Sequence, residues 1–290
     1  MLWVFYSLLS AFSLATADTL SKKSLERADE YTISWIRFLF SLPFLLLALL
    51  FIRIPQLDKT FWLSILMLLP LEISATVLYI KAIKVSPLSL TIPFLSFTPL
   101  FLILTSFLIL GEKPSPAGII GIILIVLGAY ALNINSMNSS LRGLLEPLRA
   151  LLKEKGSIYM IIVAFIYSIT SSLGKLAIIH SGPVFFGVIY YIILALAFTP
   201  ITLFKSRGNL RLRGNILDYG IIGFFIALML IFHVSAIALT DVAYMISIKR
   251  TSLLFSVIYG RLIFKEAGFR ERILGSIMMI LGVAVISILG

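Results

Sequence analysis

Residues 241–264 read DVAYMISIKRTSLLFSVIYGRLIF, and this stretch decides how the rest of the chain is interpreted. It is long and apolar enough to cross a bilayer as a helix, since about 20 mostly apolar residues suffice. Lys249 and Arg250 nevertheless stand side by side within it. A charge at such depth costs roughly 2.5–3.5 kcal/mol on insertion scales and usually faces a bundle interior or an aqueous cavity. The stretch therefore indicates either a binding cavity or a structural ion pair inside a membrane bundle.

The composition of the whole chain is that of a membrane protein. Of its 290 residues, 60% are hydrophobic and only 13% are charged, whereas soluble domains average roughly 45–50% and 25%. The net charge of +11 does not indicate nucleic-acid binding, because the basic residues are scattered over loops that flank apolar stretches. The chain has no cysteine, which excludes disulfides, thiol catalysis and cysteine metal sites.

Hydropathy and turn signals predict an all-α polytopic membrane protein with ten transmembrane helices. The spans are expected at residues 2–21, 32–52, 60–80, 87–110, 115–134, 157–177, 183–204, 216–238, 241–264 and 271–289. Residues 135–156 combine a proline, four basic residues and an apolar stripe. This segment is expected to be an interfacial linker between two halves of the chain.

The two halves repeat each other in sequence. A shift of 153 places Lys22 on Lys175, and a shift of 154 brings further residues into register: Phe101 on Phe255, Glu112 on Glu266, Gly121 on Gly275 and Gly128 on Gly282. Each half holds five predicted spans, and an odd number forces the halves into opposite orientations. Residues 1–134 and 157–290 are therefore predicted to be two inverted repeats. Transporters built in this way bind substrate near the midplane, between the repeats.

Each half ends in a pattern that resembles the EamA-like branch of the drug/metabolite transporter superfamily. The first copy reads YIKAIKVSPLSLTIPFLSFTPLFLILTSFLILGEKPSPAGIIGIILIVLGAYAL, and the second reads FHVSAIALTDVAYMISIKRTSLLFSVIYGRLIFKEAGFRERILGSIMMILGVAVI. Both have a small-residue start, a polar middle, a glutamate at the end of a span (Glu112 or Glu266) and spaced glycines in the next span. The resemblance implies a ten-helix transporter whose cavity is lined by spans one to four and six to nine. The fifth and tenth spans would lie at the periphery.

The Lys249-Arg250 pair is also similar to a Lys-Arg pair in plastid sugar-phosphate translocators, where the pair contacts the phosphate. On the ninth span, Lys249, Ser252, Ser256 and Tyr259 share one helical face. Arginine can hold a phosphate or carboxylate with two parallel bonds, and lysine adds a point charge. This face predicts an anion site, and a structural ion pair is the alternative.

Other polar residues inside the spans complete the candidate site. The fourth span carries Thr91 and Thr98 on nearly one face, and its prolines can open the helix to a cavity or simply kink it. Glu72 is either a proton-coupling carboxylate or the counter-ion of the two cations, and Asp18 is a second candidate counter-ion. Small polar residues of the sixth span are assigned to helix packing. The candidate substrate-binding residues are Lys249, Arg250, Tyr244, Thr91, Thr98, Tyr79, His233 and Tyr190.

These features predict a secondary or facilitated transporter of a small metabolite that works by alternating access. The substrate is expected to be anionic or zwitterionic, such as an amino acid, an organic acid or a sugar phosphate. A flippase for a phosphorylated lipid-linked intermediate is the alternative function. No Walker A motif, HExxH motif or paired acid and base is present, so we expect no enzyme activity, cofactor or metal. The expected partners are the lipid bilayer and the substrate. The glycine-bearing fifth and tenth spans are expected to pack against each other within the chain or to bind a second copy in a homodimer.

Two criteria disagree on the side of the membrane that holds the termini. With ten spans both termini share one side, whose loops carry four basic residues against 16 on the other side. The positive-inside rule then places the termini outside. The family resemblance implies termini in the cytoplasm, so the sequence leaves the orientation open.

Overall fold

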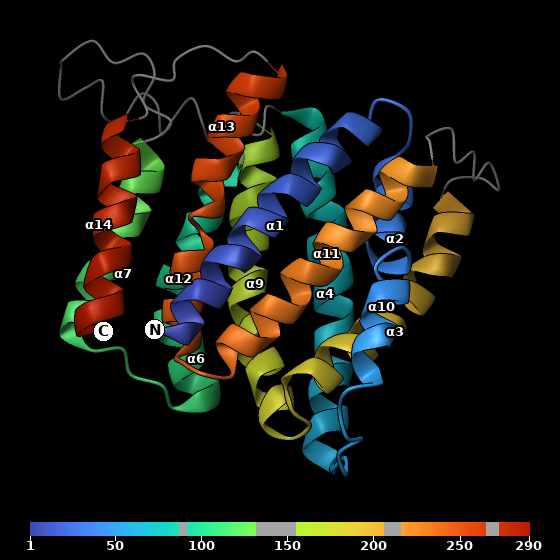
Figure 1. Ribbon diagram of the computed structural model, residues 1–290, viewed down its shortest axis with the longest axis horizontal. Helices are drawn as coiled ribbons and strands as arrows, with labels where there is room; N and C mark the ends of the chain where they lie inside the picture. Colours follow the sequence, from blue (N-terminus) through green and yellow to red (C-terminus); the bar gives the residue numbers. More distant parts are fainter. Residues whose placement is uncertain (87–91, 132–154, 206–215, 265–272) are drawn as a thin grey trace.

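The computed structural model describes residues 1–86, 92–131, 155–205, 216–264 and 273–290, which form a bundle of helices without a strand (Figure 1). In the first half the elements are α1 (Leu2–Ser24), α2 (Glu30–Leu39), α3 (Leu42–Leu49), α4 (Lys59–Val85), the 3₁₀ helix η1 (Ile92–Phe97), α6 (Thr98–Leu110) and α7 (Pro116–Ala131). In the second half they are α9 (Lys155–Ile179), α10 (Pro183–Lys205), α11 (Ile216–Ile237), α12 (Val242–Lys249), α13 (Ser252–Phe264) and α14 (Ile273–Leu289). Most of the predicted linker at residues 135–156 lies outside the described residues.

Several of these helices are long and apolar enough to cross a membrane. Six stretches qualify by length and hydropathy: Glu30–Leu49, Lys59–Val85, Lys155–Ile179, Pro183–Lys205, Ile216–Ile237 and Val242–Gly260. Three shorter helices are also apolar, and α1 occupies the first predicted span. The chain is therefore a polytopic all-α membrane protein, and the count of ten spans stays a prediction.

Local sequence signals set the helix boundaries. The Asp29 carboxylate caps α2 by accepting hydrogen bonds from the backbone N–H groups of Tyr31 and Thr32, both at 2.9 Å. Asp58 caps α4 by accepting from the N–H of Phe61, and this bond is the main reason why the pKa of Asp58 lies below its usual value. At the other end of a helix, Gly111 terminates α6 with a φ of 73°, a left-handed conformation that glycine adopts readily.

Helices that the sequence shifts relate to each other make similar contacts. α1 packs along α11, and its counterpart α9 packs along α4. The rings of Phe12 and Phe255 lie 5.4 Å apart, and those of Phe101 and Phe165 lie 5.5 Å apart, both edge to face. The 153 and 154 shifts exchange these two ring pairs. Figure 1 shows α1 rising from the N-terminus whereas α9 descends, so the two counterparts run in opposite directions.

The helices α7 and α14 pack against each other through their glycines, beside the rest of the bundle (Figure 1). A Cβ on Gly121 would lie 3.0 Å from the carbonyl oxygen of Gly282, and a Cβ on Gly128 would lie 2.7 Å from that of Gly275. Glycine therefore allows a backbone approach that any side chain would block. The glycines predicted to pack within the chain or in a dimer meet within the chain.

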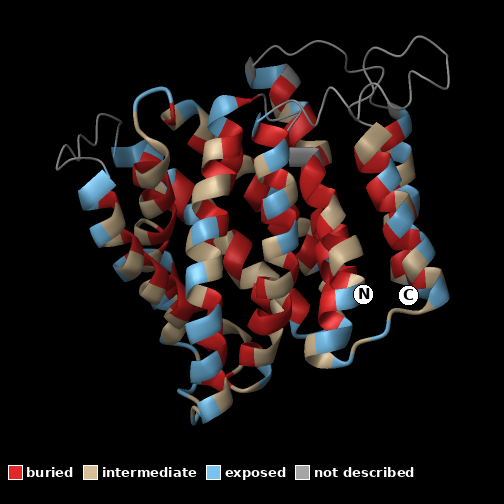
Figure 2. Cartoon of the chain, turned by 180° about the vertical axis from the view of Figure 1, so that it is seen from behind, coloured by how far each residue is buried: buried red, intermediate tan, exposed pale blue. Residues whose placement is uncertain are grey.

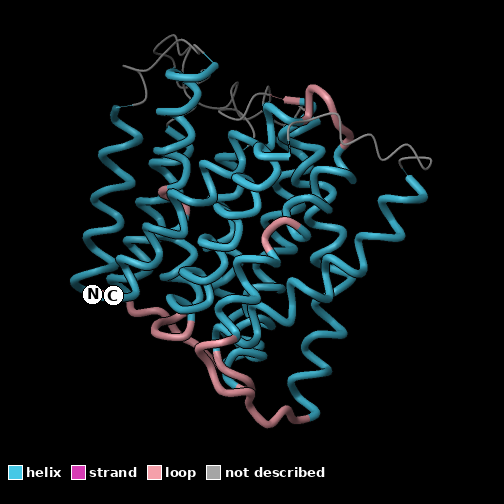
Figure 3. The backbone as a smooth tube through the Cα atoms, turned by 45° about the vertical axis from the view of Figure 1, so that its right-hand side comes forward, coloured by secondary structure: helices cyan, strands magenta, loops and turns pink. Residues whose placement is uncertain are grey.

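The outside of the bundle is apolar and the inside is partly polar. Exposed residues lie on the outward faces of the helices in Figure 2. The exposed apolar side chains include Leu47, Leu66 and Leu108, each more than half exposed. Asp18, Arg37, Lys249 and Arg250 are buried. This distribution suits a bundle whose surroundings are lipid. Figure 3 shows both termini on the same side of the bundle.

Candidate functional site

The ninth predicted span is interrupted at its two cations. α12 ends at Lys249, α13 begins at Ser252, and Leu253 N–H donates to the Arg250 carbonyl at 3.0 Å in a 3₁₀-type turn. The sequence predicted one continuous helix here. The first half has its break at the equivalent position, because η1 ends at Phe97 and α6 begins at Thr98, which is 154 residues before Ser252. Tightened turns inside helices often mark functional positions.

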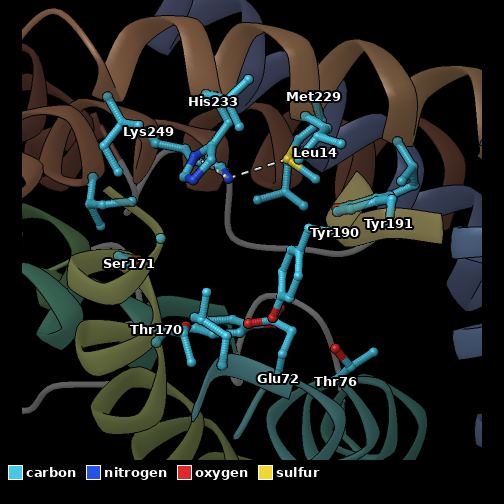
Figure 4. Close-up of a pocket in the computed structure, with 18 of the residues that line it drawn as sticks. Leu14, Glu72, Thr76, Thr170, Ser171, Tyr190, Tyr191, Met229, His233 and Lys249 are labelled. Carbon is cyan, nitrogen blue, oxygen red and sulfur yellow. Dashed lines mark hydrogen bonds between the residues drawn. The ribbon is translucent and has the colours of Figure 1, made fainter. Parts of the chain in front are cut away.

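A cavity of about 150 Å³ lies between the two halves, next to this turn (Figure 4). Helices α1, α2, α4, α9, α10, α11 and α12 line it together with η1. Its charged residues are Arg37, Glu72, Lys249 and Arg250, and its other polar residues are Thr76, Tyr79, Tyr167, Thr170, Ser171, Tyr190, Tyr191 and His233. Apolar side chains such as Phe38, Phe186 and Ile226 complete the wall.

Lys249 enters the cavity without an acidic partner. Its Nζ lies 3.1 Å from Nδ1 of His233 and 3.3 Å from Sδ of Met229. Lysine is the donor, so the histidine Nδ1 must be the acceptor. Neither partner is anionic, and the described residues contain no carboxylate within ion-pair distance of Lys249. A buried cation of this kind favours an anion brought from outside.

Arg250 joins the two helix breaks. Its Nη2 donates to Oγ1 of Thr98 at 2.9 Å, and Thr98 is the first residue of α6. Its Nε is buried and has no hydrogen-bond partner in the described part of the chain. Thr98, predicted to shape the cavity, thus acts as the partner of Arg250 and is not among the lining residues. One donor of the guanidinium remains available for another acceptor.

Asp18 is committed to a different cation from the ones expected. Its carboxylate accepts from Nη1 of Arg37 at 2.7 Å and from the hydroxyl of Tyr79 through the other oxygen. Ser21 adds a contact to the same guanidinium nitrogen at 3.3 Å, and the Tyr79 ring lies 5.6 Å from the guanidinium carbon. Arg37 is therefore half of a buried ion pair. Asp18, Arg37 and Tyr79 form one closed cluster.

Glu72 lines the cavity opposite the second-half cations. Figure 4 shows it on one side with His233 and Lys249 on the other and Tyr190 between them. It interacts with the hydroxyl of Thr170 through a hydrogen bond. Within the residues that the structure describes, it makes no ion pair with Lys249 or Arg250. The prediction that it couples to protons and the prediction that it is a counter-ion both remain untested.

The structure brings together only some of the predicted site residues. Tyr79, Tyr190 and His233 line the cavity with Lys249 and Arg250. Tyr244 does not, since its hydroxyl accepts from Ser115 N–H at 2.7 Å and its ring lies against Gly118 of α7. Thr91 lies outside the described residues.

Sequence reasoning missed the contribution of α9. Its polar residues were assigned to helix packing, yet Tyr167, Thr170 and Ser171 line the cavity. Their spacing of i, i+3 and i+4 places them on one helical face and was the signal that identifies them. Ser168 and Ser172 do bond within the bundle, because the Ser172 hydroxyl donates to the Ser168 carbonyl at 3.0 Å.

A second ionic cluster lies at the end of the bundle that holds the termini. Lys175 pairs with Glu112 and also donates to the Thr240 carbonyl at 2.8 Å. The other Glu112 oxygen accepts from Val242 N–H at 3.0 Å and so caps α12. In the first half Lys22 donates to the Ser86 carbonyl at 3.0 Å, 154 residues before Thr240. These two lysines bind backbone carbonyls at helix ends in both halves.

Comparison with known proteins places this arrangement in a family. The model of the EamA-like transporter family matches residues 1–134 and 154–288. No curated protein matches the chain. A solved crystal structure with a similar fold is 14% identical to this chain with a TM-score of 0.73, and the match covers 99% of this chain and 96% of that one. At this identity the likeness is one of fold.

Proposed function

Because the chain belongs to the EamA-like transporter family, a family of small-molecule transporters in membranes, we propose that it carries a small anionic or zwitterionic metabolite. Transport is secondary or facilitated and follows alternating access around the cavity next to Lys249 and Arg250. The proposal assigns no catalytic role to any residue of the cavity. The chain itself is a multi-pass integral membrane protein.

The observation that carries this proposal is a buried lysine without an anionic partner. Lys249 contacts a histidine and a thioether, and Arg250 contacts a hydroxyl. Two neighbouring cations cost several kcal/mol when they are left uncompensated in an apolar bundle. An anionic substrate compensates them while it is bound. Glu72 stands on the opposite side of the same cavity, so a substrate that also carries a positive group can direct it there (Figure 4).

The size of the cavity supports a small substrate. Its volume of about 150 Å³ is comparable to that of engineered protein cavities that hold benzene. A small metabolite is consistent with this volume. The flippase alternative requires room for a lipid-linked headgroup and gains no support from it.

For the movement we propose two inverted repeats of five spans, residues 1–134 and 157–290, that rock against each other. Two observations support this arrangement. The 153 and 154 shifts convert the Phe12–Phe255 ring pair into the Phe101–Phe165 ring pair, and α1 and α9 run in opposite directions. Inverted repeats allow two states of similar energy in which the cavity opens to opposite sides. Since the α7 and α14 glycines face each other, a homodimer through these helices would use their outer faces.

The test is a thermal-shift screen of the purified protein against anionic metabolites, amino acids and phospho-sugars, followed by uptake into proteoliposomes. A true substrate stabilises the wild type and enters the vesicles, and both effects are lost in Lys249→Ala. The matched control is Lys113→Ala, which removes an exposed lysine that lies against the Phe107 ring outside the cavity. Equal uptake by the wild type and Lys249→Ala would refute the anion site.

A further inference from the structure

The two halves place different residues at equivalent positions around the cavity. Matching contacts support the alignment of the two halves. Lys22 binds the Ser86 carbonyl and Lys175 binds the Thr240 carbonyl, and these carbonyls are 154 residues apart. The helices α2 and α10 begin 153 residues apart, at Glu30 and Pro183. With these shifts three pairs of residues align: Asp18 with Ser171, Arg37 with Tyr190, and Tyr79 with His233. All of them except Asp18 line the cavity.

In the first half, two of the three residues, Arg37 and Tyr79, bind the carboxylate of the third, Asp18. Arg37 and Tyr79 each donate to one oxygen of Asp18. Asp18 is 2% exposed, and Arg37 and Tyr79 are 7% and 4% exposed. The first half thus shows how this helix arrangement binds a carboxylate. One donor comes from α2 and the other comes from α4.

In the second half the same positions lack the carboxylate. Serine stands at position 171, where the first half has Asp18, and Tyr190 and His233 line the cavity beside it. The Tyr190 hydroxyl is buried and has no hydrogen-bond partner among the described residues. Lys249 lies next to His233, whereas its counterpart in the first half is Leu95. Relative to the first half, this site has lost both charges of the Asp18–Arg37 ion pair and gained a lysine.

From this comparison we infer that Ser171, Tyr190, His233 and Lys249 form a subsite for the carboxylate of the substrate, which takes the place that Asp18 fills in the first half. Figure 4 shows these four side chains in the same cavity, with Tyr190 reaching across it toward Glu72. The carboxylate accepts hydrogen bonds from the Tyr190 hydroxyl and from Nζ of Lys249, with the serine hydroxyl beside it. The inference rests on the proposed transport function and names the chemical group that the cavity selects.

The decisive variant is Ser171→Asp, which gives the second half its own carboxylate. Binding of lactate, alanine, glutamate and inorganic phosphate is measured by thermal shift on the purified full-length chain. At least one carboxylate stabilises the wild type, and Ser171→Asp weakens that binding about tenfold or more, because the new side chain occupies the donors. Ser171→Asn has nearly the same size without the charge, so the difference between the two variants reports the charge. Equal carboxylate affinity in both variants overturns the inference.

A second variant serves if Ser171→Asp does not fold. Tyr190→Phe keeps the ring and removes the unpartnered hydroxyl, and it is expected to weaken carboxylate binding about tenfold. Its control is Tyr159→Phe, the same change on α9 at a ring that lies against Lys81 and outside the cavity. An unchanged affinity in Tyr190→Phe counts against the subsite.

The outcomes separate this inference from the transport proposal. If only inorganic phosphate binds, and Lys249→Ala abolishes that binding, the anion site stands and the carboxylate subsite is wrong. If a carboxylate binds equally well to the wild type, Lys249→Ala and Ser171→Asp, both fail. If no carboxylate stabilises the wild type, the subsite is refuted.

Discussion

Replacing Asp18 by Asn removes the charge that compensates Arg37 inside the bundle. The two groups form an ion pair of 2.7 Å, with side chains only 2% and 9% exposed. Removing one partner of a buried pair costs about 3–5 kcal/mol, because the other charge stays buried. Arg37 keeps its contacts with Ser21 and the Tyr79 ring, and a desolvated cation–π contact retains up to about 2 kcal/mol. We therefore expect Asp18→Asn to lower the free energy of unfolding by about 3 kcal/mol.

The assay is reversible unfolding in mixed detergent micelles, followed by helical circular dichroism. The matched control is Glu30→Gln, which breaks the Lys84–Glu30 pair of the same length with lysine 37% exposed. Such partly exposed pairs contribute about 0–1 kcal/mol. The double variant of Asp18→Asn and Arg37→Gln is expected to be more stable than Asp18→Asn alone. If Asp18→Asn costs no more than Glu30→Gln, the cluster does not hold the first half together.

Three further predictions concern stability at other positions. Glu112→Gln removes an ion pair and weakens a helix cap, so it should lower the free energy of unfolding by about 1–2 kcal/mol, whereas Lys113→Gln should have little effect. Gly128→Ala places a Cβ 2.7 Å from a carbonyl of α14 and should lower the free energy of unfolding by about 1–3 kcal/mol. In the control Gly220→Ala the new Cβ has nothing within 4 Å, so the change should be neutral or stabilising by up to about 1 kcal/mol. Equal effects of the two changes would contradict the α7–α14 packing. The lowered pKa of Asp58 stabilises the folded state above the unfolded pKa of about 4, and this is lost as pH falls through the folded pKa. Asp58→Asn should therefore flatten the decrease of the unfolding midpoint between about pH 5 and pH 3.

The architecture was largely accessible from the sequence. Hydropathy located the helices, and the predicted family and membrane class are confirmed. Matches such as Phe101 on Phe255 correspond to ring contacts that the two halves share. These residues are informative because packing against a symmetry-related partner restricts both copies in the same way.

The interior of the site was less accessible. The turn after Lys249 contains neither proline nor glycine, so no local signal distinguished it from a continuous helix. Asp18 was expected to compensate the second-half cations, but Arg37 lies on the adjacent α2 and pairs with it. Tyr244 points to α7 because the helix face it occupies depends on how α12 is rotated. Which buried charges meet depends on helix rotation, and periodicity alone does not fix it. The binding roles of Lys249, Arg250 and Glu72 stay predictions.

The closed cluster of Asp18, Arg37 and Tyr79 also bears on how such a chain can evolve. A duplicated half that supplies its own carboxylate needs no ligand to be stable, and its three residues constrain one another against substitution. The other half has serine at position 171, so its equivalent residues are not constrained by a buried ion pair. If the inferred carboxylate subsite is correct, changes at Ser171, Tyr190 and His233 alter what is transported without breaking the Asp18–Arg37 ion pair. In this view the ion pair of the first half supplies stability, and the second half is where a substitution changes specificity at the least cost in stability.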